Sequence, residues 1–204
     1  MPTGSRIARE NAATVVEKVH VKHQSKRDLR AGLLNARAAL SAAERCSHDA
    51  AIAAAVLGWL SAHPAQVLGV YWPIRNEPDL HGLYAQLAAS EVQLALPVMT
   101  GSDRPLSFAK WMPGEEMEID RWGIATPRVI LNVMPDALLI PCVGYDLRRF
   151  RLGYGAGYYD RTLATDPRPQ AIGIAYTTCR TEFEVEPHDC AMDIVLTEAT
   201  RTQD

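Results

Sequence analysis

Short apolar runs separate longer segments with helical spacing, and this alternation constrains the fold more than any other feature of the chain. The runs cover residues 67–72, 92–98, 137–141, 171–176 and 193–197. Short runs that are apolar throughout are typical of strands buried on both faces, as in a parallel sheet. Strands that alternate with helices predict a three-layer α/β/α fold with a mainly parallel, Rossmann-like sheet.

Two helices are predicted before the first strand. From Ser25, apolar residues recur at helical spacing together with one arginine, at Leu29, Leu33, Leu34, Arg37 and Leu40. Residues 41–44 have the form of a capping box and should begin the second helix, which ends at His63-Pro64. Further helices are expected over residues 80–90 and up to about Ala164, and residues 106–111 should add a hairpin strand at the sheet edge.

Length and composition narrow the class of protein. The 204 residues suit one domain. We expect residues 1–24 to be a flexible extension and residues 25–204 to form a single catalytic domain. The net charge of −3 argues against a general nucleic-acid binder. No apolar run approaches the roughly 18 residues of a membrane span, and no secretory signal opens the chain.

The cysteines indicate the redox compartment. Cys46, Cys142, Cys179 and Cys190 include no Cys-x-x-Cys pair. A zinc site or a disulfide framework is therefore not expected, and a reducing cytoplasm is the simpler inference.

A glycine-rich stretch over residues 151–161 carries the strongest functional signal. It reads Arg-Leu-Gly-Tyr-Gly-Ala-Gly-Tyr-Tyr-Asp-Arg. Its alternating glycines allow positive φ, and successive free N–H groups in such a loop form an anion site. Arg151 and Arg161 bracket the loop with guanidinium groups suited to phosphate, and Asp160 offers a carboxylate to a magnesium ion. With two tyrosine rings nearby, these residue types fit a nucleoside triphosphate, its metal and an aromatic substrate.

The stretch does not match a general nucleotide-binding motif. It lacks the Gly-Lys-Ser/Thr of a Walker A loop, and its third glycine comes one residue too early for a dinucleotide fingerprint. A tight strand-to-helix turn without a ligand is the alternative interpretation.

Three further positions are candidates with open alternatives. Glu77 follows the first predicted strand, where open α/β sheets place their ligands, but it could be an ordinary surface carboxylate. Lys26 and Arg30 share one helix face, which could simply be solvated. Trp122 lies in a segment, 122–127, that we read as irregular; its indole looks exposed, although core packing is the default for tryptophan.

Taken together, these residues resemble the 5-formyltetrahydrofolate cyclo-ligase family, also called 5,10-methenyltetrahydrofolate synthetases. The resemblance spans about residues 25–198 and rests on five separated pieces in the family's order. The pieces are residues 26–30 (Lys-Arg-Asp-Leu-Arg), 76–77 (Asn-Glu), 139–141 (Leu-Ile-Pro), 151–161 and 187–189 (Pro-His-Asp). The glycine-tyrosine piece is the most specific of the five.

The resemblance implies an enzyme that uses ATP and Mg²⁺ to close 5-formyltetrahydrofolate into 5,10-methenyltetrahydrofolate. ATP would be bound by Lys26, Arg30, Arg151, Leu152, Gly153, Tyr154, Gly155, Ala156, Gly157, Tyr158 and Tyr159. Mg²⁺ would be held by Asp160 and Asp189. The reduced folate would meet Trp72, Glu77, Trp122, Tyr154 and Tyr158, and the catalytic residues would be Arg151, Tyr158 and Glu77.

The implied chemistry needs no covalent enzyme intermediate. Phosphorylation of the formyl oxygen activates the formyl carbon, N10 attacks it, and phosphate leaves. The protein's main task is to hold the formyl oxygen in line with the γ-phosphate and to spread charge. We expect a monomer or a weak homodimer.

Three positions depart from the family pattern. Arg149 and Thr126 are where we expect the pocket shape to differ, and Cys179 is where we expect folate contacts to differ. Two alternatives stand beside the ligase: a paralogue that acts on another small molecule, and a non-catalytic folate or nucleotide binder.

Overall fold

The structure is a computed structural model that describes residues 25–200. The predicted flexible extension, residues 1–24, lies outside the described residues, as do residues 201–204.

A seven-stranded mixed sheet forms the centre of the molecule, in the order β11-β10-β7-β1-β2-β3-β6. The five strands β11, β10, β7, β1 and β2 are parallel to one another, whereas β3 is antiparallel to both of its neighbours, β2 and β6. The mainly parallel sheet is therefore confirmed. Its strands are β1 Val67–Gly69, β2 Gln93–Val98, β3 Ser107–Trp111, β6 Asn132–Val133, β7 Ala137–Pro141, β10 Gln170–Ile174 and β11 Ile194–Leu196.

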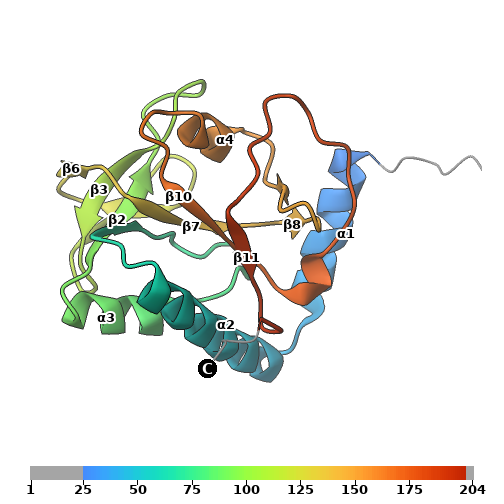
Figure 1. Cartoon of the computed structure of the whole chain (residues 1–204), viewed down its shortest axis with the longest axis horizontal. Helices are drawn as coiled ribbons and strands as arrows, with labels where there is room; N and C mark the ends of the chain where they lie inside the picture. The colour runs from blue at the N-terminus through green and yellow to red at the C-terminus, as the bar shows by residue number, and fades with distance from the viewer. Residues whose placement is uncertain (1–24, 201–204) are drawn as a thin grey trace, which may run out of the picture.

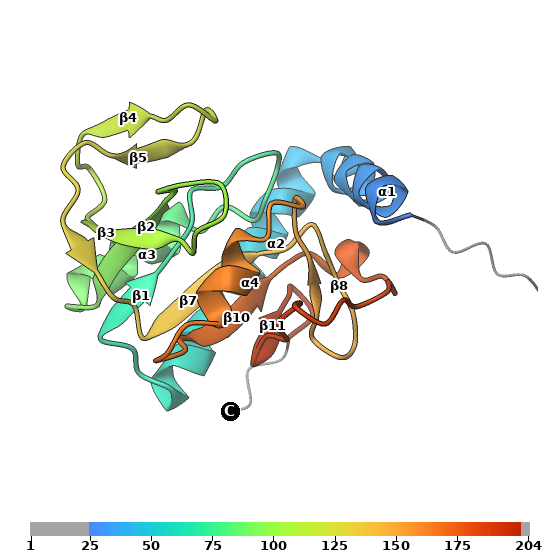
Figure 2. The same ribbon diagram turned by 90° about the horizontal axis from the view of Figure 1, so that it is seen from above.

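Helices cover both faces of this sheet. Figures 1 and 2 show α2 (Ala42–Ala62) and α3 (His81–Ala89) on one face and α4 (Tyr158–Leu163) on the other. Helix α1 (Lys26–Ala39) stands at one end of the molecule, beside the 3₁₀ turn η1 (Thr177–Cys179) and the small ribbon of β8 (Gly144–Tyr145) and β9 (Arg151–Leu152). The three-layer α/β/α prediction is confirmed.

The first two helices begin where the sequence predicts, α1 after Ser25 and α2 after Ser41. The Ser25 side chain accepts a hydrogen bond from the Asp28 N–H at the start of α1. A complete capping box joins Ser41 and Glu44 at the start of α2, and His63 closes that helix. Side-chain oxygens that satisfy free N–H groups at a helix start explain why these boundaries could be located from the sequence.

Two segments differ from the sequence-based expectation. The run over residues 67–72 forms strand only to Gly69, so Trp72 lies in the loop that follows. The region around Trp122 is not irregular throughout, because β4 (Met117–Ile119) pairs with β5 (Ala125–Pro127) in an antiparallel hairpin. Each strand has only three residues, which is too few to show the alternation that marks a strand in a sequence.

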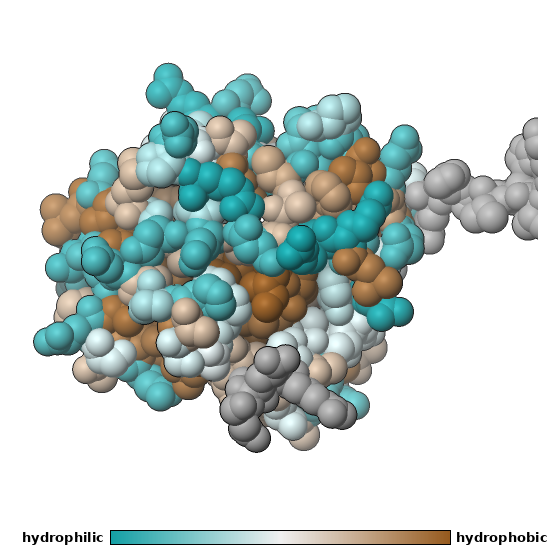
Figure 3. Space-filling model, viewed as in Figure 1, coloured by the Kyte–Doolittle hydropathy of each residue, from teal (hydrophilic) through white to brown (hydrophobic). Residues whose placement is uncertain are grey.

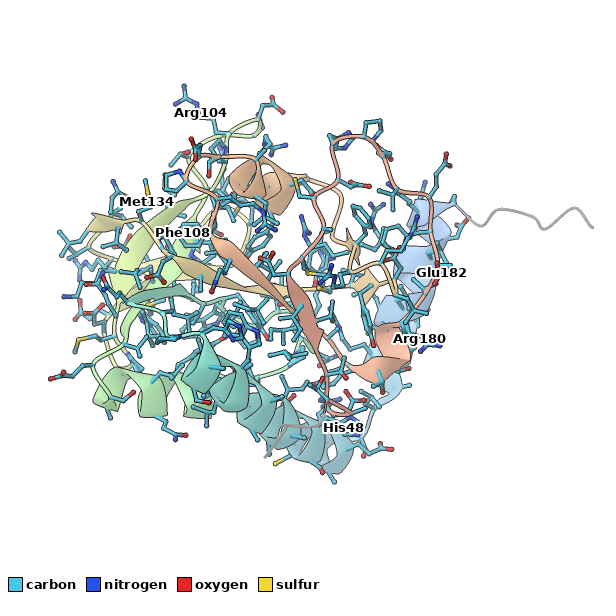
Figure 4. All side chains as sticks on the ribbon, in the orientation of Figure 1. His48, Arg104, Phe108, Met134, Arg180 and Glu182 are labelled. Atoms are coloured by element: carbon cyan, nitrogen blue, oxygen red, sulfur yellow. The ribbon has the colours of Figure 1, made fainter. Side chains whose placement is uncertain are left out.

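The β3 and β6 side of the molecule forms an exposed sheet edge, and the predicted hairpin of β2 and β3 lies there. Apolar side chains gather at the left edge of Figure 3, and Figure 4 shows Met134 on the same side, beyond Phe108. Met134 is 72% exposed, whereas Phe108 is 5% exposed and packs towards Gly69. Within residues 25–200, no helix is long and apolar enough to cross a membrane.

Candidate active site

A cavity of about 520 Å³ lies at the carboxyl ends of β1, β2 and β7. From β1 the chain continues to β2 on one side of it and later returns to β7 on the other side. The strand order thus reverses between β1 and β7, which is where open α/β sheets bind ligands. The topology alone therefore places a binding site here.

The glycine-rich stretch, residues 151–161, forms one end of the cavity, which we call the glycine-loop end. It is a strand-to-helix turn, as the alternative interpretation proposed, and it also lines the cavity. Gly155 and Gly157 have φ of +100° and +68°, where other residues would be strained. At Gly153 a Cβ atom would collide with Nη1 of Arg151, so this glycine admits the guanidinium.

Arg151 crosses beneath the loop and pairs with Asp160. Its Nη2 lies 2.8 Å from Asp160 Oδ2, and the two side chains are 5% and 16% exposed. The buried Nε of Arg151 has no hydrogen-bond partner among the described residues. An unsatisfied buried donor is costly, so this end of the cavity is prepared for an acceptor.

Helix α1 brings two more cations to the glycine-loop end. Arg30 Nε donates to the Gly153 carbonyl at 2.8 Å. Lys26 Nζ lies 2.7 Å from Glu186 Oε1 and 3.4 Å from Asp189 Oδ2. Burial alone would lower the pKa of Lys26, but the bonds to these carboxylates outweigh it and raise the pKa, so Lys26 is charged.

Asp160 and Asp189 both line the cavity, each with one oxygen turned to a cation. Asp160 Oδ1 accepts a long hydrogen bond of 3.3 Å from the Cys190 N–H. No cluster of three or more His, Cys, Asp or Glu residues within residues 25–200 could hold a metal with protein ligands alone. Mg²⁺ needs no such cluster, because it commonly binds one or two carboxylates, water and substrate phosphates. The donor set fits that ion.

Arg161 does not share the position of Arg151. Its guanidinium donates to the carbonyls of Ser102, Arg104 and Ala156, and it is absent from the cavity lining. The expectation that both arginines would face phosphate is therefore wrong for Arg161. Its side chain instead ties the glycine loop to the turn between β2 and β3, and its own Cζ lies 5.1 Å from the Tyr158 ring centre.

The other end of the cavity, which we call the aromatic end, is formed around Glu77. Glu77 is 4% exposed, so the interpretation as a surface carboxylate is wrong. It closes a tight turn in which Arg75 and Asn76 both have positive φ, and its Oε2 accepts from the Ile74 N–H at 3.0 Å. Burial raises the pKa of Glu77, and the hydrogen bonds from the Ile74 N–H and the Tyr154 hydroxyl oppose the rise.

Arg37 is a residue of this end that the sequence analysis did not select. It lies in α1, is 1% exposed, and donates to Tyr154 Oη at 2.9 Å. Tyr154 Oη in turn donates to Glu77 Oε1 at 2.7 Å. The signal was present in the sequence, because an arginine within an apolar helical stripe must be buried with its partners.

Aromatic side chains form the wall beside Glu77. Trp72 packs edge-on against His81 and Trp111, with ring centres 4.6 and 6.1 Å apart. Trp122 lies on the β4–β5 hairpin and is 46% exposed, so the default of core packing is wrong for it. The guanidinium of Arg121 lies 3.9 Å from the Trp122 ring centre. These faces can take a flat ring system.

Apart from Arg161, the structure brings every predicted site residue to this one cavity. Its lining includes Lys26, Arg30, Trp72, Glu77, Trp122, Arg151, Leu152, Gly153, Tyr154, Gly155, Ala156, Gly157, Tyr158, Tyr159, Asp160 and Asp189. Chemically, it joins an anion-binding end to an aromatic end with a buried carboxylate.

Comparison with known proteins decides the family. The sequence model of the 5-formyltetrahydrofolate cyclo-ligase family matches residues 22–198 of this chain. The chain belongs to this family. It is therefore an enzyme of the ligase class, and the predicted resemblance is confirmed.

Named members of the cyclo-ligase family show how far the similarity extends. The 5-formyltetrahydrofolate cyclo-ligase of Mycoplasma pneumoniae is 30% identical over 84% of this chain and 97% of its own length. That of Mycolicibacterium smegmatis is 32% identical over 85% of this chain and 94% of its own length. The solved 5,10-methenyltetrahydrofolate synthetase of Aquifex aeolicus is 28% identical, with a TM-score of 0.72, and covers 88% of this chain and 93% of its own.

The three departures from the cyclo-ligase pattern lie outside the cavity lining. Arg149 donates to the Asp193 carbonyl, and Thr126 lies in the β4–β5 hairpin, where it donates to the Glu118 carbonyl. Cys179 is fully buried in η1. These three side chains could therefore change the pocket shape or the folate contacts only through the residues around them.

Proposed function

We propose that this protein cyclises 5-formyltetrahydrofolate to 5,10-methenyltetrahydrofolate in a reaction that depends on Mg²⁺, converts ATP to ADP and releases phosphate. The observation that carries the proposal is the single cavity with a cationic glycine-loop end and an aromatic end around Glu77. The γ-phosphoryl group of ATP must be transferred to the formyl oxygen of the folate, so the triphosphate and the reduced pterin must lie side by side. The names of the relatives support the reaction, and the chemistry of the two ends of the cavity supports binding of both substrates there.

The glycine-loop end would bind the triphosphate. The loop N–H groups and the side chains of Lys26, Arg30 and Arg151 surround this end. Two of these cations are paired with carboxylates: Arg151 with Asp160, and Lys26 with Glu186 and, at a longer distance, with Asp189. When phosphates arrive, the cations would turn to them, because bidentate and charge-assisted bonds to phosphate are strong. The released carboxylates would then be free for a metal.

Asp160 and Asp189 would hold the Mg²⁺ that accompanies ATP. The ion would supply positive charge to the phosphate oxygens as they accept electron density. The protein would contribute two anionic ligands and leave the remaining positions to water and phosphate, which is the usual arrangement for this ion.

The aromatic end would bind the folate. Trp72 and Trp122 offer ring faces, and Tyr154 and Tyr158 come from the loop itself. An ionised Glu77 only accepts hydrogen bonds, so it would orient N–H groups of the pterin and its linking amines. Tyr158, at the first turn of α4, would lie between the two substrates. Arg151 would spread the charge that develops on the transferred phosphoryl group.

The experiment that tests the proposal measures product formation directly. The purified full chain is mixed with 5-formyltetrahydrofolate, ATP and Mg²⁺, and the absorbance of the methenyl product is recorded alongside released phosphate. Both should appear in equal amounts and require all three components. Tight binding of ATP without turnover would favour a non-catalytic binder, and turnover of ATP only with another small molecule would favour a paralogue.

Compartment and assembly complete the proposal. All four cysteines are free, Cys142 and Cys179 being buried. Free thiols accord with a reducing compartment, so we assign the protein to the cytoplasm. We expect a monomer or a weak homodimer.

A further inference from the structure

Arg37 is not itself a lining residue of the cavity, but it hydrogen-bonds three separate segments around it. Its Nε donates to the Arg75 carbonyl at 3.0 Å, in the turn after β1. Its Nη1 donates to the Cys142 carbonyl at 3.3 Å, just after β7, and its Nη2 donates to Tyr154 Oη at 2.9 Å, in the glycine loop. A guanidinium that is 1% exposed needs such partners, because an unpaired buried charge is strongly destabilising.

The direction of the hydrogen bonds fixes what Arg37 does to Glu77. Arginine only donates, so Tyr154 Oη must accept from it. The single proton of that hydroxyl is then given to Glu77 Oε1, 2.7 Å away. The second oxygen of Glu77 accepts from the Ile74 N–H. Both carboxylate oxygens therefore accept a hydrogen bond, which favours the ionised form of Glu77, because that form only accepts.

We propose that Arg37 is a positioning residue for the folate substrate: acting through Tyr154 Oη, it holds Glu77 ionised and oriented at the aromatic end of the cavity. The inference rests on the proposed function and adds a residue to it. Without Arg37, the hydroxyl of Tyr154 loses its donor, and the Ile74–Glu77 turn loses the bond to the Arg75 carbonyl.

The position of Arg37 on α1 links this task to the glycine-loop end. Lys26, Arg30 and Arg37 fall within about 40° of one another around a regular helix, so they share one face. Arg30 bonds the Gly153 carbonyl and Arg37 bonds the hydroxyl of the next residue, Tyr154. One helix therefore holds two successive residues of the glycine loop, and a change at Arg37 should act on the folate side of that loop.

The charged and titratable groups around Glu77 predict the effect of pH. Burial raises the pKa of Glu77, and the positive charges of Arg37 and Arg75 lower it. The other titratable groups that face Glu77 are neutral, because burial raises their pKa values and keeps them protonated. They are Tyr71, Tyr84, Cys142, Tyr154 and Tyr159. Removing the charge of Arg37 should therefore raise the pKa of Glu77 further. Glu77 would then become protonated at a higher pH than in the wild type, and folate binding should weaken from that pH downwards.

The test compares Arg37→Met with Arg27→Met, an exposed arginine on the same helix. Initial rates are measured with the full chain against 5-formyltetrahydrofolate, ATP and pH. Arg37→Met should raise the folate KM by about 10- to 100-fold, the range for losing hydrogen bonds to charged groups, and should leave the ATP KM nearly unchanged. The acid limb of kcat/KM should move to higher pH. Arg37→Lys should recover part of the loss because it keeps the charge, and Arg27→Met should behave as wild type.

Two further variants keep the inference testable if Arg37→Met does not fold. Tyr154→Phe removes only the connecting hydroxyl from a ring that is 38% exposed, and should raise the folate KM in the same way. In a Glu77→Gln background, adding Arg37→Lys or Tyr154→Phe should cost little more, because residues that act through one group are not additive.

Folded Tyr154→Phe or Arg37→Met protein with a wild-type folate KM and pH profile would overturn the inference. Full additivity with Glu77→Gln would also overturn it. Failure of the wild-type protein to form methenyl product would instead refute the proposed function, and it would be seen before any variant is made.

Discussion

The two ends of the cavity are built in different ways from the same chain. The glycine-loop end comes mainly from one contiguous stretch, residues 151–160, whose backbone N–H groups need only glycines at set positions. The aromatic end is assembled from the turn after β1, the β4–β5 hairpin and a buried arginine of α1. A local motif can bind phosphate because phosphate is recognised by main-chain geometry and charge, whereas a ring system needs walls from several elements.

The largest effect should follow from removing the buried cation of the glycine-loop end. In Arg151→Ala, both the phosphate contact and the partner of Asp160 are lost. Hydrogen bonds to charged groups contribute about 1.5–3 kcal/mol, so kcat/KM should fall by about 10- to 150-fold. Arg168→Ala removes an exposed arginine paired with Asp193 and should leave the rate unchanged. Equal ATP dependence in Arg151→Ala and wild type would remove Arg151 from the phosphate site.

A comparable effect should appear at the other end, but in a different kinetic constant. Glu77→Gln keeps the shape of the buried side chain, loses its charge, and offers Tyr154 Oη an amide in place of a carboxylate. The folate KM should rise by about 10- to 100-fold, since hydrogen bonds to charged groups are at stake, and the ATP KM should change much less. If the ATP KM rises while the folate KM stays constant, the division of the cavity into two ends is wrong.

The same contrast explains which parts could be predicted from the sequence. The sheet, the capped helices and the glycine loop follow from local patterns: apolar runs, the Ser41–Glu44 box and alternating glycines. The burial of Glu77 could not be read locally, because Tyr154, which is distant in the chain, supplies one of its hydrogen bonds. The apolar stripe indicates that Arg37 is buried, but it does not identify Tyr154 as a partner. The β4–β5 hairpin was missed because its strands are too short to show a period. Trp122 lies on this hairpin and is exposed, whereas tryptophan is by default expected in the core.

A smaller effect is expected from Asp160→Asn, which separates the metal's share of the glycine-loop end from that of the cations. The amide keeps the volume but removes one hard anionic ligand and weakens the bond to Arg151. The Mg²⁺ concentration at half-maximal rate should rise by about 10-fold, the scale of one charge-assisted bond, and the folate KM should stay near wild type. A magnesium titration that overlays wild type would instead leave Asp160 as a partner of Arg151 and of the Cys190 N–H alone.

The smallest effect should come from shortening the chain to begin at Ser25. Among the residues that the structure describes, Lys26 is the first that lines the cavity. Ser25 must be kept, because its hydroxyl caps α1 and thereby fixes the start of the helix that carries Lys26, Arg30 and Arg37. We expect folding and both KM values to stay within about 2-fold of wild type, whereas starting at Lys26 should lose the cap, worth about 1 kcal/mol of stability. Thermal unfolding and initial rates of the two shortened chains measure this difference. A loss of folded protein in the chain that begins at Ser25 would mean that residues 1–24 contribute to the fold, and a selective rise of the ATP KM would assign them to the glycine-loop end.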